Sequence, residues 1–132
     1  MKVISVLEPW ASLIKEEVKY IETRSWKTKY RGELYIHASK RNLTKKDIIN
    51  YKDQLSLLKV IDFKYGHIIA KCNLIDCKYM TEELIREVQE NHHEYICGNY
   101  KIGRYAWILE NIEILENPIE AKGQLGIWAY KK

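Results

Sequence analysis

Five short segments of the sequence alternate apolar residues with other residues, and turn-forming residues bound most of them. Such a period of two places successive side chains on opposite faces of an extended chain, so it predicts β-strands. The predicted strands are residues 3–7, 34–39, 67–77, 105–116 and 127–130. In the third strand we expect Ile68, Ala70, Cys72 and Leu74 on one face. Asn117 and Pro118 should end the fourth strand.

Helical periodicity occurs only between these strands. Apolar residues at helical spacing predict helices at residues 9–17, 45–58 and 82–91, and Thr44 and Thr81 stand at the N-cap positions of the last two. Residues 91–103 are polar and rich in glycine and aromatics, and we expect them to form a mobile lid. The predicted fold is mainly β with inserted helices (α+β): a small closed or nearly closed β-barrel with helices packed outside.

The chain has 132 residues, so we expect a single domain spanning residues 1–132. The N-terminus lacks the apolar core of a signal peptide and no apolar run approaches the roughly 20 residues of a membrane span, so we expect a cytoplasmic protein that does not enter the membrane. The three cysteines are an odd number with the wrong spacing for a zinc knuckle. We therefore expect no disulfide framework, no metal and no cofactor. Nothing in the sequence fixes the oligomeric state.

Charge is distributed unevenly along the chain. Residues 19–46 contain nine Lys or Arg and two Glu, a net charge of +7, whereas residues 80–120 contain nine Glu and three Lys or Arg, a net charge of −6. A basic end favours a ligand that carries phosphate. A solvated charged surface is the alternative, and the charge pattern alone leaves both open.

The densest group of functional side chains is K-x-x-E-x-R-x-W, formed by Lys19, Glu22, Arg24 and Trp26. In an extended segment the last three share one face, and Lys19 joins them only if a turn or bulge intervenes near residues 18–20. A carboxylate can accept from base amines, a guanidinium can bind phosphate in a bidentate manner and an indole can stack. A salt-bridged, half-buried strand without a ligand remains the structural alternative.

Further candidate ligand-binding residues surround this group. The aromatic and cationic candidates could contact bases and phosphates, and His37 and Ser39 could be hydrogen-bonding groups of the same cleft, although a structural role for His37 is equally open. These residues are Tyr30, Arg31, His37, Ser39, Lys40, Tyr105 and Trp107.

Several segments together resemble the ASCH domain family, a relative of the PUA-like barrel superfamily. They are Glu8-Pro-Trp-Ala-Ser-Leu-Ile14, the K-x-x-E-x-R-x-W group, Thr28-Lys-Tyr-Arg-Gly32, Ile36-His-Ala-Ser-Lys40, Asp76-Cys77, Gly103-Arg-Tyr-Ala-Trp107 and Asn117-Pro-Ile-Glu-Ala-Lys-Gly-Gln-Leu-Gly-Ile-Trp128. The resemblance runs nearly from end to end. It implies a β-barrel with a cleft at the K-x-x-E-x-R segment, and activities such as RNA or DNA binding, transcription coactivation, ribonuclease action or hydrolysis of N-acetylated cytidine.

Two positions depart from the family pattern. Many members carry glycine where this chain has Glu17, in the turn after the first helix. The amidohydrolase members resemble K-x-x-T-x-R, whose threonine hydroxyl can act as a nucleophile, whereas Glu22 has no hydroxyl. The second departure weakens the transfer of amidohydrolase activity to this chain.

Three hypotheses about function follow. The first is a module that binds RNA, or a nucleotide or nucleoside, with DNA as another possible partner. The second is a metal-independent hydrolase, either a ribonuclease or a nucleoside amidohydrolase, with Lys19 and Glu22 as catalytic residues and Arg24 stabilising developing negative charge. The third is a protein-interaction module of the coactivator type. Phosphate contacts would make affinity fall steeply with salt, which separates the first hypothesis from the third.

Overall fold

The computed structural model describes residues 1–131, and six strands form one sheet within this range. The strands are β1 (Lys2–Val6), β2 (Ile21–Arg24), β3 (Gly32–Ala38), β4 (His67–Tyr79), β5 (Tyr105–Glu120) and β6 (Ile127–Ala129). Their order across the sheet is β2-β5-β4-β3-β1-β6. β1 and β3 are parallel and the other neighbouring pairs are antiparallel.

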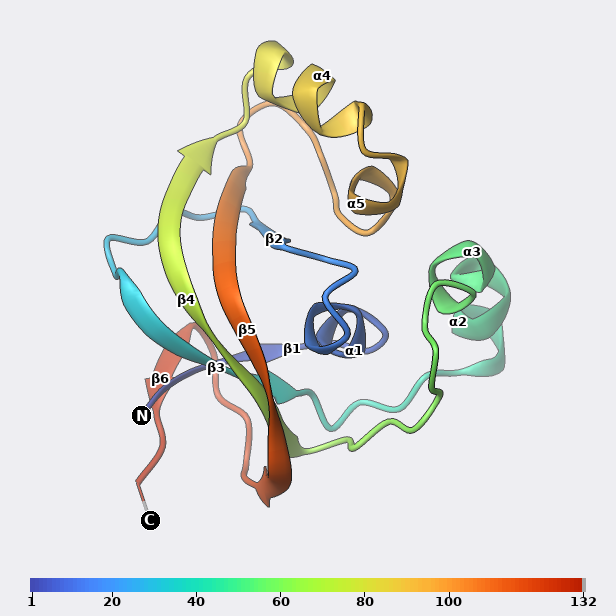
Figure 1. The fold of residues 1–132 in the computed structure, drawn as a ribbon, viewed down its shortest axis with the longest axis vertical. Helices are drawn as coiled ribbons and strands as arrows, with labels where there is room; N and C mark the ends of the chain where they lie inside the picture. Colours follow the sequence, from blue (N-terminus) through green and yellow to red (C-terminus); the bar gives the residue numbers. More distant parts are fainter. Residues whose placement is uncertain (132) are drawn as a thin grey trace.

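The sheet curls into a half-barrel and leaves β2 and β6 as its edges (Figure 1). The helices are α1 (Trp10–Lys15), α2 (Lys45–Asn50), α3 (Lys52–Leu55), α4 (Glu82–Gln89) and α5 (His92–Ile96). α1 lies within the curl of the sheet, α4 lies beyond the end of β4, and α5 lies below α4 on the same side of the sheet as α1 (Figure 1). This architecture confirms the predicted PUA-like fold, in which strands predominate and helices are inserted between them.

The main hydrophobic core fills the concave side of the sheet. Ile4 and Val6 from β1 pack there with Ala11 and Ile14 of α1, and Trp107 of β5 is fully buried in the same cluster. Burying an aromatic side chain of this size contributes about 1.5–3 kcal/mol relative to leaving it exposed. α1 and β2 are therefore held against a rigid support.

A second, smaller cluster lies on the other face of β1. Val3 packs there with Ile68 and Trp128, because side chains along β1 alternate between the two faces. The expectation that Ile68 shares a face with Ala70, Cys72 and Leu74 is wrong. The pairing of β4 with β5 shifts between Ile68 and Ala70, and such an irregularity changes which face the following side chains occupy.

Other element boundaries also differ from the prediction. β5 continues through Pro118 to Glu120, because only β4 pairs with this half of β5 and proline, which has no N–H, is tolerated on a free edge. The predicted helix at residues 45–58 is divided at Tyr51, whose backbone leaves the helical conformation. Residues 91–103 contain a helix that the sequence analysis missed, α5, which begins after Asn91.

No helix among residues 1–131 is long and apolar enough to cross a membrane.

Candidate functional site around Lys19, Glu22 and Arg24

The end of α1 and the start of β2 create a buried cluster of charges. The Lys19 side chain is 1% exposed, and its ammonium donates to the carbonyl oxygens of Ile21 and Cys97, the latter at 2.7 Å. The ammonium also lies 3.6 Å from Oε1 of Glu22. Two carbonyl acceptors and one carboxylate thus compensate the burial of this charge.

The turn that the sequence analysis required between α1 and β2 is present. Glu17 adopts a left-handed conformation with φ of 61°, and the N–H groups of Val18 and Lys19 both donate to the carbonyl of Leu13. This turn changes the direction of the chain, so that Lys19 can meet Glu22 despite their unfavourable spacing on a strand. Glu17 occupies the position at which many ASCH members carry glycine, the residue that adopts this conformation without steric cost.

Arg24 completes the cluster and joins it to β1. Its Nε donates to Oε2 of Glu22 at 2.9 Å, and one Nη atom lies 2.8 Å from the same oxygen in an ion pair and donates to the carbonyl of Ser5 at 2.9 Å. The Glu22 side chain is only 11% exposed, and its carboxylate lies between the cations of Lys19 and Arg24. The three charged residues of the motif are thus brought together.

Glu94 of α5 is a second buried carboxylate near Lys19. Its oxygens accept from the backbone N–H groups of Tyr20 at 2.7 Å and Ile21 at 3.4 Å. Burial raises the pKa of this carboxyl, and those hydrogen bonds and the nearby Lys19 oppose the rise. The sequence analysis missed Glu94 because no periodicity or motif links residues 91–103 to residues 19–24. The same segment, expected to be a mobile lid, is anchored to β2 by these contacts.

A small pocket opens above this cluster, and we call it the Lys19 pocket. It has a volume of about 250 Å³. Trp10, Lys19, Glu22, Thr23, Cys97, Gly98, Asn99 and Arg104 line it. Arg104 was not a predicted site residue; its Nε donates to the carbonyl of Asn99 at 3.0 Å, and a terminal nitrogen lies 3.5 Å from the carbonyl oxygen of Thr23.

The predicted aromatic residues have different surroundings. Trp26 is 37% exposed and packs edge-on against the buried Trp107, with ring centroids 4.8 Å apart. Trp107 is part of the core, and its ring supports the exposed ring of Trp26. Tyr105 is the register partner of Arg24 and packs against Tyr79.

Tyr30 and Arg31 lie away from the Lys19 pocket. The Tyr30 hydroxyl donates to the carbonyl of Glu33, and Arg31 donates to the carbonyls of Thr28 and Tyr30. Arg31 also forms an ion pair with Asp76 at 3.7 Å. These contacts order the loop between β2 and β3, and neither side chain lines the pocket.

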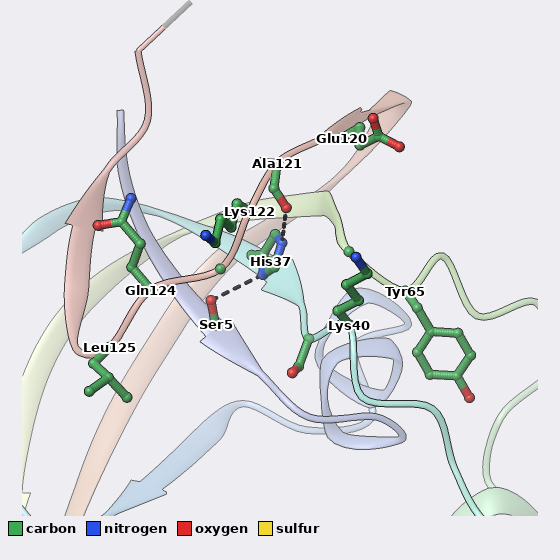
Figure 2. A pocket seen from close by; sticks show the side chains of 12 residues that line it. Ser5, His37, Lys40, Tyr65, Glu120, Ala121, Lys122, Gln124 and Leu125 are labelled. Carbon is green, nitrogen blue, oxygen red and sulfur yellow. Dashed lines mark hydrogen bonds between the residues drawn. The ribbon is translucent and has the colours of Figure 1, made fainter.

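His37, Ser39 and Lys40 lie at a different pocket, which we call the Gly123 pocket. It has a volume of about 890 Å³ and lies where the connection between β5 and β6 folds over the sheet (Figure 2). Ser5, His37, Ser39, Lys40, Tyr65, Gly66, Glu120, Ala121, Lys122, Gly123, Gln124 and Leu125 line it. The residues expected in a single cleft are therefore separated: Lys19 and Glu22 line the Lys19 pocket, and His37, Ser39 and Lys40 line the Gly123 pocket. The other predicted residues line neither; they are Arg24, Trp26, Tyr30, Arg31, Tyr105 and Trp107. Among residues 1–131 no three His, Cys, Asp or Glu side chains are grouped to hold a metal ion.

A curled mixed sheet, with a helix in its concavity and a Lys-Glu-Arg cluster at its edge strand, defines a PUA-like barrel domain. The chain belongs to the ASCH domain family, whose model matches residues 4–120. Activating signal cointegrator 1 of Homo sapiens is 30% identical over 107 residues, and its counterpart in Mus musculus is 29% identical over 107 residues. Each alignment covers 73% of this chain but only 18% of the relative's length.

Proposed function

We propose that this domain binds RNA and receives one unstacked nucleobase in the Lys19 pocket. The observation that carries the proposal is the position of Glu22 in the pocket lining. Lys19 and Arg24 fix its carboxylate in place, as a pre-organised acceptor for the amino or imino groups of a base. Since the carboxylate already has two cationic partners, it need not reorganise when a ligand binds.

The dimensions of the Lys19 pocket fit a single base. Its volume of about 250 Å³ lies below the roughly 300–1,000 Å³ typical of pockets for drug-sized ligands. The half-buried Trp10 forms one wall, and Tyr51 packs edge-on against its indole with ring centroids 5.1 Å apart. An oriented indole is a suitable surface for stacking, which contributes about 1–3 kcal/mol per base.

Cations near the pocket are placed to contact the phosphates of a bound RNA. Arg104 lies at the pocket, and its contacts with two carbonyls hold its guanidinium there. The basic segment at residues 19–46 adds charge beyond the pocket, and exposed lysines at positions 27 and 29 belong to it. A chain of phosphates crossing this surface would account for the uneven charge distribution.

Titration of short single-stranded RNA at two salt concentrations tests the proposal, with DNA of the same sequence and free nucleosides as comparison ligands. We expect Arg104→Gln to weaken RNA binding and to reduce the salt slope by about one unit. Arg86→Gln is the matched control, because Arg86 is an exposed arginine of α4 and the net charge changes equally. Glu22→Gln should change the order of affinity among the four nucleosides. Equal binding by all three variants and the wild type would contradict the proposal.

The hydrolase hypothesis gains no support from the surroundings of Lys19. A general base needs an accessible lone pair, whereas the Lys19 ammonium donates to two carbonyls and lies beside Glu22. Lys19 in this arrangement is a positioning cation for Glu22. Incubation of RNA and of N-acetylcytidine with the protein, without added metal, would detect hydrolysis if this reasoning is wrong.

Protein interaction is the second candidate function. The observation that favours it is the name of the relatives, which describes a cointegrator. Binding of a protein partner should depend less steeply on salt than binding of RNA, so the same two-salt titration separates the two candidates. A cytoplasmic location is also part of the proposal, and it is supported by the free thiols of Cys72, Cys77 and Cys97.

A further inference from the structure

The Gly123 pocket is separate from the Lys19 pocket and is built by a different part of the chain. After β5 the chain turns back at Ala121, whose N–H donates to the carbonyl of Gly66 at 3.0 Å, and the N–H of Gly66 donates to the carbonyl of Ala38 at 2.7 Å. Residues 121–126 then pass over the ends of β1 and β3 before β6 begins (Figure 2). The cavity of about 890 Å³ is enough for a ligand much larger than a single base.

One wall of this pocket is a chain of hydrogen bonds. Ser5 Oγ lies 3.0 Å from Nδ1 of His37, and Nε2 of His37 lies 2.8 Å from the carbonyl oxygen of Ala121 (Figure 2). Trp128 Nε1 extends the chain by donating to Ser5 Oγ at 3.2 Å. Because a carbonyl can only accept, Nε2 carries the hydrogen, and in the neutral imidazole Nδ1 then accepts from the Ser5 hydroxyl. The wall is thus fixed before any ligand arrives.

Gly123 occupies a position where a side chain would press on this wall. An added Cβ would lie 3.0 Å from Cε1 of His37 and 3.0 Å from Oγ of Ser5, closer than ordinary contact. The backbone at Gly123 has no left-handed φ, unlike that at Gly126, so conformation does not require glycine here. Space favours it: a side chain here would force the Ser5–His37 pair to shift by a few tenths of an ångström.

The charged groups of the pocket lack partners within the protein. Lys40 and Lys122 are exposed and line the pocket, and neither forms an ion pair with any residue among 1–131. Glu120 lines the same pocket and is likewise without an ion pair in that range. Figure 2 shows Lys40 and Lys122 on either side of His37. Two ammonium groups suit a phosphate, and a single carboxylate suits a donor such as a sugar hydroxyl or a base amine.

Tyr65 adds an aromatic surface to the pocket. The Tyr65 hydroxyl accepts from the N–H of Leu43 at 3.2 Å, and Phe63 packs against the ring with centroids 5.7 Å apart. These contacts orient the half-buried ring. A flat, aromatic ligand group could therefore stack at the end of the pocket where Lys40 lies (Figure 2).

We propose that the Gly123 pocket binds a nucleotide phosphomonoester, with the phosphate near Lys40 and Lys122 and the base against Tyr65. The nucleotide can be free or can be the phosphorylated end of an RNA, since the two share this chemistry. The pocket does not depend on the Lys19 pocket, and either proposal can fail while the other stands.

Titrations followed by backbone amide NMR shifts test this site. The probes are AMP and UMP, the nucleosides adenosine and uridine, inorganic phosphate, and a short RNA with and without a 5′-phosphate. We expect AMP or UMP to shift the amides of Gly66, Gly123 and Gln124 and to bind more tightly than the nucleoside or phosphate alone. Tighter binding of the 5′-phosphorylated RNA than of free AMP and UMP would identify an RNA end as the occupant, and the reverse order would identify the free nucleotide.

The variant Lys40→Gln/Lys122→Gln should weaken nucleotide binding by at least about tenfold, because two charge-assisted contacts are lost. The matched control Lys52→Gln/Lys59→Gln removes the same charge from exposed positions that line neither pocket and should bind AMP and UMP within about twofold of wild type. Arg104→Gln should leave this site unchanged while weakening the Lys19 pocket. Absence of shifts at Gly123 and Gln124 with every phosphorylated probe would overturn the proposal, as would unchanged affinity in Lys40→Gln/Lys122→Gln. If inorganic phosphate binds as tightly as AMP and UMP, the proposed contact between the base and Tyr65 is wrong.

Discussion

Replacing Lys19 with methionine should destabilise the domain strongly. The substitution keeps most of the side-chain volume but removes a charge that is 1% exposed, donates to the carbonyls of Ile21 and Cys97 and lies 3.6 Å from Glu22. Breaking a buried ion pair by deleting one partner costs about 3–5 kcal/mol, since the other charge and its acceptors remain buried. Arg24 still pairs with Glu22, so the lower end of that range, about 3 kcal/mol, is the expected loss in free energy of unfolding.

Urea unfolding followed by tryptophan fluorescence measures this loss. With a slope of about 1–3 kcal/mol per molar, a loss of about 3 kcal/mol lowers the midpoint by about 1–3 M. The double variant Lys19→Met/Glu22→Gln should recover part of the loss, because Glu22→Gln removes the carboxylate left without Lys19. A matched Lys15→Met variant, on the half-buried surface of α1, should change the midpoint little.

The same variant has a predicted pH dependence. Lys19 opposes the rise in the Glu94 pKa, so its removal raises that pKa further. A carboxyl whose folded pKa is raised favours folding below its unfolded pKa, and this contribution is lost as pH rises through the folded pKa. The gap between wild type and Lys19→Met should therefore narrow as pH falls toward 4.5, the ordinary value for this carboxyl. If Lys19→Met lowers the free energy of unfolding by less than about 1 kcal/mol at every pH, the reasoning is refuted. The cluster would then contribute no more than exposed ion pairs do.

Three further outcomes can be measured on the same protein. Glu17→Gly should raise the free energy of unfolding by up to about 1 kcal/mol, since it relieves a left-handed φ of 61°, and a lower urea midpoint would contradict this. Cys77 should react with a thiol reagent well before Cys72, because burial raises the pKa of the Cys72 thiol to about 12, and equal labelling rates would count against it. Burial raises the pKa of Glu8 despite its hydrogen bonds from Ser12. The stability of the wild type relative to Glu8→Gln should therefore be highest below pH 4.5 and decline as pH rises, and a difference in stability that does not change with pH would contradict this.

Much of the fold could be predicted because the strands carry strong local patterns. The segments at residues 3–7, 34–39 and 67–77 lie within a residue or two of β1, β3 and β4. Local sequence patterns do not predict which strands pair with each other. The irregularity after Ile68 and the persistence of β5 through Pro118 both depend on which neighbour each strand has, and that is set by contacts distant in sequence.

The site was predictable in part for the same reason. Lys19, Glu22 and Arg24 lie within six residues, so an extended segment preceded by a turn brings them together, and the sequence analysis made the contact of Lys19 depend on that turn. Glu94 and Arg104 reach the same place only because α5 and the following loop pack against β2, which no spacing reveals. His37 was assigned to the same cleft as Arg24, but the backbone places it at the Gly123 pocket on the other side of Ser5.

The bond between Arg24 and Ser5 also bears on self-association. A half-barrel has two edge strands whose free backbone groups could pair with another chain. β2 has four residues and β6 only three, and Arg24 occupies the carbonyl of Ser5 where β1 continues past its pairing with β6. A bulky charged side chain therefore covers a backbone acceptor that an extended peptide would need in order to add to the sheet. Losing Arg24 would lengthen the free edge and open the domain to strand addition and aggregation.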